Sequence, residues 1–138
     1  MKLFVDTNVL FDVLARRDPF YDDSAAVWSQ VERGAIAGFV SAISFNNVYD
    51  VMRRMADERS ATEAVRILRD VFQIVSLDAQ VMNQAIGSRK RDFEDAIQYV
   101  SALRADADVL VTRNVEDFPR DDLAVLTPAE FLAQQSFL

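Results

Sequence analysis

Short apolar runs alternate with longer amphipathic stretches along this chain. Five runs rich in valine, leucine and isoleucine predict buried strands, at residues 2–5, 38–41, 74–75, 109–111 and 124–126. The stretches between them predict helices, because they carry apolar residues at helical spacing or capping residues, at residues 9–14, 20–33, about 48–55, 60–72, 78–87, from 92 onward and 128–134. Strands that alternate with helices indicate parallel pairing by right-handed crossovers, with helices on both faces. We therefore predict an α/β fold that is rich in helix.

Two of these helices are predicted in more detail. Ser60 and Glu63 have the spacing of a capping box, which places the start of one helix at Ser60. Asp92 is a candidate N-cap for another helix, whose predicted buried face consists of Phe93, Ile97 and Val100.

Length and composition describe an ordinary globular chain. At 138 residues, with 51% apolar and 27% charged residues, it is expected to form one domain over residues 1–138 with a real core. No apolar run approaches the ~20 residues that a membrane span needs. The first strand begins at Lys2 and leaves no room for a signal peptide, so the cytoplasm is the expected location.

The chain contains neither cysteine nor histidine. The lack of cysteine excludes disulfides, thiolate zinc sites and cysteine nucleophiles. The lack of histidine excludes a Ser-His-Asp triad and histidine general-base chemistry. Any metal ion must therefore be held by oxygen ligands, which favours Mg²⁺ or Mn²⁺.

The net charge of -7 argues against non-specific binding of nucleic acid through bulk charge. It does not exclude an enzyme that acts on nucleic acid, because a bound metal ion would neutralise part of that charge. Basic clusters occur at residues 16–17, 53–54 and 89–91, and they are either solvated helix surfaces or local contacts for an anionic substrate.

Acidic residues gather where strands end and where one helix begins. Asp6 directly follows the first strand, and Asp117 lies in the loop after the strand at residues 109–111. Asp92 and Asp95 are three residues apart, so both face one side of a helix start, whereas Glu94 is expected to face solvent. Carboxylates collected at one edge of a sheet repel each other unless a metal ion lies between them. Asp6 and Asp92 also have a structural alternative as helix caps.

Three motifs in this chain resemble the PIN-domain family, and within it the compact single-domain toxin ribonucleases of the VapC type. They occur in the family's order and extend over most of the chain: Asp6-Thr7-Asn8, Asp95-Ala96, and Thr112-Arg113-Asn114 followed by Asp117-Phe118. The resemblance implies a small doubly wound parallel sheet flanked by helices, with a helical insertion between strands.

The same resemblance implies a metal-dependent endoribonuclease, the toxin of a toxin–antitoxin pair. The cofactor would be Mg²⁺ or Mn²⁺, and the partners an RNA substrate, an antitoxin protein and a second copy of the chain. The implied metal ligands are Asp6, Asp95 and Asp117, with Asp92 assisting. Asn47 and Asn114 complete the implied catalytic set, and Asn114 would orient groups. Arg113 would contact a phosphate or form a surface ion pair.

The chain departs from the family at Asn47, where many members carry a glutamate. An amide is a weaker ligand, so metal affinity should be lower, unless Asp50 one turn further on replaces it. This departure motivates a second hypothesis, a catalytically weak or inactive PIN domain that acts as a binding or dimerisation module. A phosphotransfer domain with Asp6 as nucleophile is disfavoured, because the second acid and the lysine that it needs are missing.

Two amphipathic helices carry more apolar surface than one small sheet is expected to cover. Their stripes are predicted either to form a dimer surface or to pack against each other as an antiparallel pair. The stripes consist of Val48, Val51, Met52 and Met55 on one helix and Ala64, Leu68 and Phe72 on the next.

Overall fold

The computed structural model describes residues 1–88 and 92–135, so the basic cluster at residues 89–91 lies outside the described residues. Within them, five parallel strands form one sheet in the order β3-β2-β1-β4-β5. The strands are β1 (Lys2–Val5), β2 (Ala37–Ser41), β3 (Gln73–Val75), β4 (Val109–Val111) and β5 (Ala124–Leu126). The predicted α/β class is confirmed, and three strands have the predicted bounds.

The helices of the described residues connect these strands. They are α1 (Thr7–Leu14), α2 (Tyr21–Glu32), α3 (Ala42–Met55), α4 (Glu58–Val71), α5 (Ala79–Gly87), α6 (Phe93–Arg104) and α7 (Pro128–Gln135), with a 3-10 turn η1 (Val115–Asp117). The pair α3 and α4 forms the predicted helical insertion between β2 and β3. None of these helices has the length and apolar character needed to cross a membrane.

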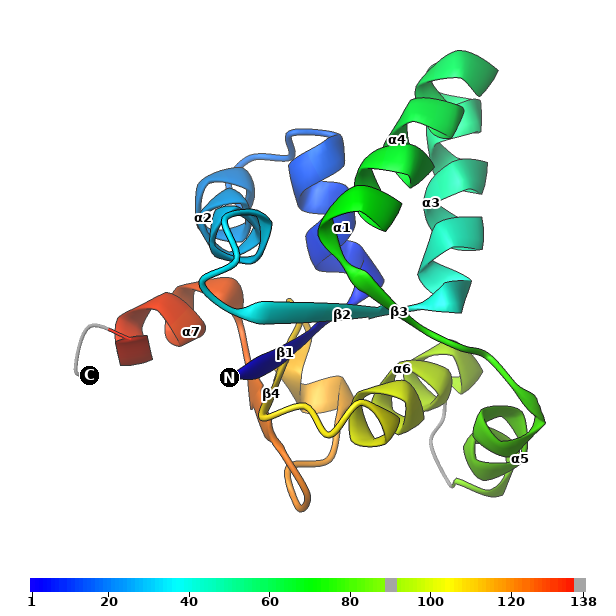
Figure 1. Cartoon of the computed structure of the whole chain (residues 1–138), viewed down its shortest axis with the longest axis vertical. Helices are drawn as coiled ribbons and strands as arrows, with labels where there is room; N and C mark the ends of the chain where they lie inside the picture. The colour runs from blue at the N-terminus through cyan, green and yellow to red at the C-terminus, as the bar shows by residue number, and fades with distance from the viewer. Residues whose placement is uncertain (89–91, 136–138) are drawn as a thin grey trace.

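The sheet separates two layers of helices. Figure 1 shows α1 to α4 on one side of the strands and α5 and α6 on the other. Successive side chains of a strand point to opposite faces, so Leu3 and Val5 pack into the core on the side of α1 to α4, whereas Phe4 packs beside Tyr99 of α6. Helices therefore bury both faces of the sheet, as expected for parallel strands with continuous apolar runs.

The chain changes direction across the sheet at β1. After β1 it builds β2 and β3 on one side, and β4 and β5 lie on the other side. Ligand sites of open α/β sheets lie outside the carboxyl ends of the strands at such a switch point. In this chain the switch point lies between Asp6 and Thr112, and the Asp6 N–H donates to the Val111 carbonyl at 3.0 Å.

Two of the detailed helix predictions were wrong. Helix α4 begins at Glu58, two residues before the predicted start, because Asp57 is its N-cap and accepts a hydrogen bond from the Ser60 N–H at 2.7 Å. Phe93 was predicted to be buried, but it is 47% exposed. It occupies the first position of α6, whose buried residues begin only at Ala96.

The proposed excess apolar surface on α3 and α4 is mostly core. Val48, Ala64, Leu68 and Phe72 are at most 5% exposed, and the Phe72 ring lies edge-on to Trp28 with centroids 5.0 Å apart. The two helices pack against each other, which was the alternative prediction. These four residues are therefore unavailable for a dimer surface, whereas Val51 and Met52 are half-buried and Met55 is 57% exposed.

Candidate acidic site

Asp6 lies at the centre of the candidate site. It is the N-cap of α1 and only 6% exposed. One carboxylate oxygen accepts from the Thr7 N–H at 2.7 Å, and the other accepts from the Thr112 hydroxyl at 2.8 Å. Burial raises the pKa of Asp6 to about 6, against the lowering effect of these two hydrogen bonds, and the charges of Glu94 and Asp117 raise it further. Asp6 is therefore a fixed carboxylate whose negative charge is poorly compensated.

A small network of polar groups joins the ends of β1 and β4. The Thr112 hydroxyl accepts from the Asn114 N–H at 3.1 Å while it donates to Asp6. The Asn8 side chain spans the same gap, since its amide oxygen accepts from the Arg113 N–H at 3.4 Å. Asn114 thus takes part through its backbone, and the role predicted for its side chain stays a prediction.

The start of α6 brings acidic groups toward the same edge of the sheet. Asp92 is the N-cap of α6, as its structural alternative predicted, and it accepts from the Asp95 N–H at 3.1 Å. Asp95 is half-buried, with buried Ala96 behind it. Whether Asp92 and Asp95 also bind metal remains a proposal.

Glu94 is the acidic residue that the sequence analysis missed. Its side chain accepts a hydrogen bond from the Asn47 amide of α3 at 2.7 Å, although the residue as a whole is exposed. Burial of the carboxyl group and the charge of Asp92 raise the pKa of Glu94, which the hydrogen bond from Asn47 opposes. The charge of Glu94 in turn disfavours ionisation of Asp6. Glu94 therefore belongs to the electrostatic surroundings of the site.

Asn47, and not Asp50, lies next to these acids. Asp50 is exposed and its carboxylate pairs with Arg54 at 2.9 Å along the outer surface of α3. The contact between Asn47 and Glu94 instead joins α3 to α6 beside the candidate site. Asn47 therefore places an amide beside the acidic groups, at the position where the sequence analysis noted a departure from the glutamate of the resembling family.

Asp117 ends η1 and is exposed. The next residue, Phe118, is 5% exposed and packs in the core on the α6 side of the sheet, which anchors the loop as expected. Asp117 also borders an open hollow of about 490 Å³. That hollow is lined by Ser88, Ala96, Tyr99, Glu116, Asp117, Phe118 and Pro119.

The donor chemistry of this region fits a hard divalent cation. Asp6 presents a buried carboxylate that is destabilised by its own burial and by the charges of Glu94 and Asp117, and a bound cation would stabilise its ionised form. Carboxylate and amide oxygens are the ligands that Mg²⁺ and Mn²⁺ prefer. In residues 1–88 and 92–135 no three acidic side chains have already converged on a single point.

Arg113 has a different role from the phosphate contact that was one of its predicted functions. Its Nε lies 2.9 Å from a carboxylate oxygen of Asp12, which is fully buried in α1. The guanidinium carbon lies 4.3 Å from the centre of the Phe20 ring. Neither Asp12 oxygen has a well-aligned hydrogen bond among the described residues, so the two groups interact mainly as an ion pair. Arg113 therefore compensates a buried charge.

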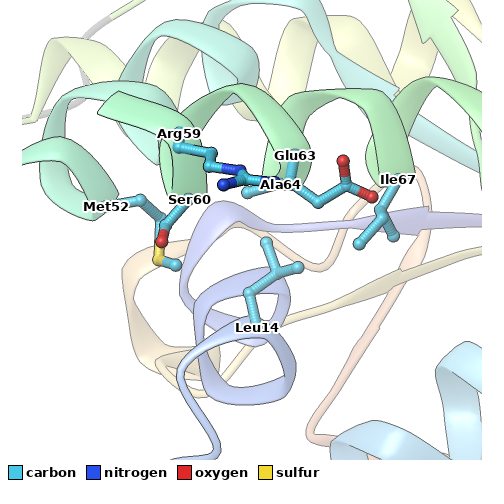
Figure 2. A pocket seen from close by; sticks show the side chains of 7 residues that line it. All are labelled: Leu14, Met52, Arg59, Ser60, Glu63, Ala64 and Ile67. Atoms are coloured by element: carbon cyan, nitrogen blue, oxygen red, sulfur yellow. The ribbon is translucent and has the colours of Figure 1, made fainter. Parts of the chain in front are cut away.

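A second hollow, of about 460 Å³, opens between α1, α3 and α4, away from the acidic residues. Figure 2 shows Leu14 pointing toward α4, while Arg59 and Glu63 carry their charged groups along its edge. Its lining contains no residue that contacts Asp6, so this hollow takes no part in the chemistry of the acidic site.

Comparison with known proteins identifies the family. A family model described as PIN domain matches residues 2–116, so this chain belongs to the PIN-domain family. No curated protein sequence matches the chain significantly.

Several solved structures share the fold. VapBC-1 from nontypeable Haemophilus influenzae is 20% identical with a TM-score of 0.70, over 94% of this chain and 99% of that one. A toxin–antitoxin complex from Klebsiella pneumoniae is 24% identical with a TM-score of 0.68, over 93% and 98%. Mycobacterium tuberculosis VapC20, described as a toxin that cleaves the sarcin-ricin loop, is 17% identical with a TM-score of 0.64, over 78% and 86%. Because the sequence identities are this low, the structural similarity establishes the shared fold and nothing further.

Proposed function

We propose that this chain is a metal-dependent endoribonuclease that hydrolyses RNA phosphodiester bonds with Mg²⁺ or Mn²⁺, and that it is the toxin of a toxin–antitoxin pair. The observation that carries the proposal is the buried Asp6 carboxylate at the switch point of the sheet, held by Thr112 and faced by further acids. Structural neighbours described as toxins and toxin–antitoxin complexes support the biological role.

In this proposal Asp6, Asp95 and Asp117 hold the cation, and Asp92 assists them. A bound divalent ion supplies Lewis-acid stabilisation of charge on the phosphate oxygens and helps to activate the attacking water. The network of Thr112, Asn8 and the Asn114 backbone fixes Asp6, so that the ligand needs little reorganisation.

The remaining side chains set the electrostatics around the cation. Asn47 holds Glu94 by a hydrogen bond and leaves its second carboxylate oxygen able to accept a proton or to orient a water molecule. The raised pKa of Glu94 makes it a stronger proton acceptor than an ordinary carboxylate, which suits it for a proton transfer. No histidine is needed for this chemistry.

A second candidate function is a catalytically inactive PIN domain that serves as a binding module, and the amide at Asn47 is the observation that favours it. Incubation of a fluorescent RNA oligonucleotide library with the purified chain separates the two. Cleavage that requires Mn²⁺ and stops with chelator supports the enzyme. Binding without cleavage at any Mn²⁺ concentration supports the module.

Mn²⁺ should stabilise the folded chain. A ligand that binds the assembled site and not the unfolded chain raises the free energy of unfolding by mass action, about 2.7 kcal/mol at one hundred times its Kd. Mn²⁺ should act at lower concentration than Mg²⁺, following the usual order of affinities. Thermal unfolding at increasing Mn²⁺, Mg²⁺ and Na⁺ tests this at constant ionic strength. A Tm that is equally insensitive to all three would contradict the metal site.

Replacing the amide by the acid that the family favours should change two properties in opposite directions. Asn47→Glu removes the 2.7 Å hydrogen bond to Glu94 and brings two carboxylates together, so the metal-free protein should lose about 1 kcal/mol of stability. The added carboxylate should tighten Mn²⁺ binding by about 1 kcal/mol, roughly fivefold in Kd. Calorimetry and urea unfolding measure both, with Asp50→Glu as the control on the outer surface of α3.

We also propose a homodimer and an antitoxin partner, in the cytoplasm. Because Val48, Ala64, Leu68 and Phe72 are core, the dimer surface would have to use residues that stay accessible, such as Met55. Light scattering at tens of micromolar should give twice the monomer mass of 15.6 kDa. A monomeric mass at that concentration would remove the dimer from the proposal.

A further inference from the structure

A buried polar triangle joins three separate parts of the chain. The Gln98 side chain of α6 is completely buried, and its amide nitrogen donates to the Thr7 hydroxyl at 2.9 Å and to the Ser44 hydroxyl at 3.2 Å. The two hydroxyl oxygens share a third hydrogen bond at 2.7 Å. Thr7 is 7% exposed and Ser44 is fully buried, so the triangle is closed off from solvent.

Each corner of the triangle is next to a residue of the candidate site. Thr7 follows Asp6 and donates its N–H to the Asp6 carboxylate. Ser44 and Asn47 are three residues apart on α3, and Glu94 and Gln98 are four residues apart on α6, so each pair shares one face of its helix. The triangle therefore links the same three elements, α1, α3 and α6, that carry Asp6, Asn47 and Glu94.

Stability alone does not explain a glutamine at this position. The Gln98 carbonyl oxygen is buried and has no hydrogen-bond partner among the described residues. An unsatisfied buried acceptor of this kind costs about 1–3 kcal/mol, which offsets much of what the two hydrogen bonds from the amide nitrogen contribute. The neighbouring residue Ile97 shows that α6 packs apolar side chains in the core without difficulty. The stability that the carboxamide adds is therefore small.

The acidic site needs a connection of this kind. The carboxylates of Asp6 and Glu94 belong to different elements and repel each other in the absence of a cation. Apolar packing is non-directional and permits small sliding movements between helices. Hydrogen bonds at 2.7–3.2 Å fix the distances between their donor and acceptor atoms.

We propose that Gln98 is a positioning residue, which through Thr7 and Ser44 holds α1, α3 and α6 at the separation that the acidic site requires. This role rests on the proposed nuclease function for its effect on catalysis, but the connection itself is a property of the fold. Because Gln98 is completely buried, it acts only through the residues beside Asp6, Asn47 and Glu94.

The test compares Gln98→Met, which keeps the length of the side chain and removes its donor, with Ser101→Ala. Ser101 lies on the same helix, is fully buried and has an unpartnered hydroxyl among the described residues, so it controls for the loss of a buried polar group. Thr7→Val and Thr7→Ser form a second pair, because Ser retains the hydroxyl. Steady-state cleavage of an RNA oligonucleotide with Mn²⁺ gives kcat and KM, and amide exchange gives a readout without catalysis.

Gln98→Met should lower kcat on the order of tenfold and change KM less than twofold, since small misplacements of reacting groups are costly. It should also speed hydrogen exchange of the Thr7 N–H, which donates to the Asp6 carboxylate. The reference is the Val81 N–H, which donates to the N-cap carboxylate of α5 in the same way and lies outside the triangle. Ser101→Ala should change neither quantity. Thr7→Val should lower kcat and speed exchange as Gln98→Met does, whereas Thr7→Ser should match the wild type. The double variant Thr7→Val/Gln98→Met should have a kcat no lower than that of either single variant, because both changes break the same connection.

The two proposals can fail separately. If Gln98→Met and Ser101→Ala leave the exchange ratio of the Thr7 and Val81 amides equally unchanged, the positioning role is overturned, whatever the catalytic result. If the exchange ratio changes as expected but the wild type neither binds Mn²⁺ nor cleaves RNA, the connection stands and the nuclease proposal fails. A fall in kcat that Ser101→Ala reproduces would also overturn the positioning role.

Discussion

Arg113→Met should destabilise the fold by about 3 kcal/mol at pH 7, because it leaves the fully buried Asp12 carboxylate without its partner. Burial already raises the pKa of Asp12, and the charge of Arg113 is the main influence that lowers it. Removing that charge raises the pKa further. Protonation of Asp12 in the folded state then reduces the loss of stability, and the charge of Arg17 reduces it by a smaller amount.

The stability lost in Arg113→Met should depend on pH. A carboxyl group whose pKa is raised by folding binds its proton more tightly in the folded state, so stability falls as pH rises from the unfolded pKa through the folded one. The deficit of Arg113→Met should therefore be large at pH 7 and shrink as pH falls toward 4. Urea unfolding at several pH values measures it, as a shift in midpoint at constant slope.

Two variants make the interpretation specific. Arg69→Met removes an arginine from an exposed pair with Asp70 and should cost less than about 1 kcal/mol. Asp12→Leu in the Arg113→Met background replaces the buried pair by apolar groups and should recover most of the stability. If Arg113→Met unfolds at the wild-type midpoint at pH 7, the Asp12 charge is not buried as described.

The fold could be predicted because its signals are local. The apolar run of residues 3–5 and the run of residues 109–111 are short and continuous, as buried parallel strands require. The order of strands and helices then leaves few topologies. Periodicity also predicts that a helix face is buried, but not what covers it. For that reason the sequence left two alternatives for the α3 and α4 stripes, a dimer surface or mutual packing, and the structure shows that the two helices pack against each other.

The sequence predicts a site residue only where its position next to a strand or helix end already indicates a role. Asp6 follows a buried strand, and that position alone places it at the crevice. Glu94 was missed because an acidic residue in the first turn of a helix is ordinary. Its contact with Asn47 joins residues 47 positions apart.

The polar groups inside the core were hidden for the same reason. In the sequence Asp12 and Gln98 stand among apolar neighbours like solvent-facing positions of amphipathic helices. Their partners, Arg113 and Thr7, are 101 and 91 positions away. Only tertiary structure brings such pairs together, so local pattern and helical spacing cannot reveal them.

Asp6→Asn should abolish Mn²⁺-dependent cleavage and change stability with opposite signs in the absence and presence of metal. Cleavage should fall at least about a hundredfold, since even the groups that orient metal ligands contribute 10–100-fold. Without metal, the variant should be more stable than the wild type at pH 7. Its neutral amide avoids the cost of ionising a carboxyl group whose pKa burial raises to about 6.

The size and pH range of that gain follow from the shift in pKa. Wild-type stability should fall as pH rises from about 4 to about 6, because the folded state holds the Asp6 proton longer than the unfolded chain does. The full effect would be on the order of 3 kcal/mol at pH 7, and the loss of a charged hydrogen-bond acceptor for Thr112 reduces it, so we expect a gain of about 1–2 kcal/mol. The gain should vanish near pH 4.

Saturating Mn²⁺ should reverse the order of stability, because only the wild type gains the free energy of metal binding. Urea unfolding of both proteins with chelator and with Mn²⁺ measures the reversal. Asp70→Asn, which removes an exposed carboxylate on α4, should follow the wild type in every condition. An Asp6→Asn protein that is strongly destabilised with chelator and still cleaves RNA with Mn²⁺ would show that Asp6 serves the fold as the cap of α1 and not the chemistry.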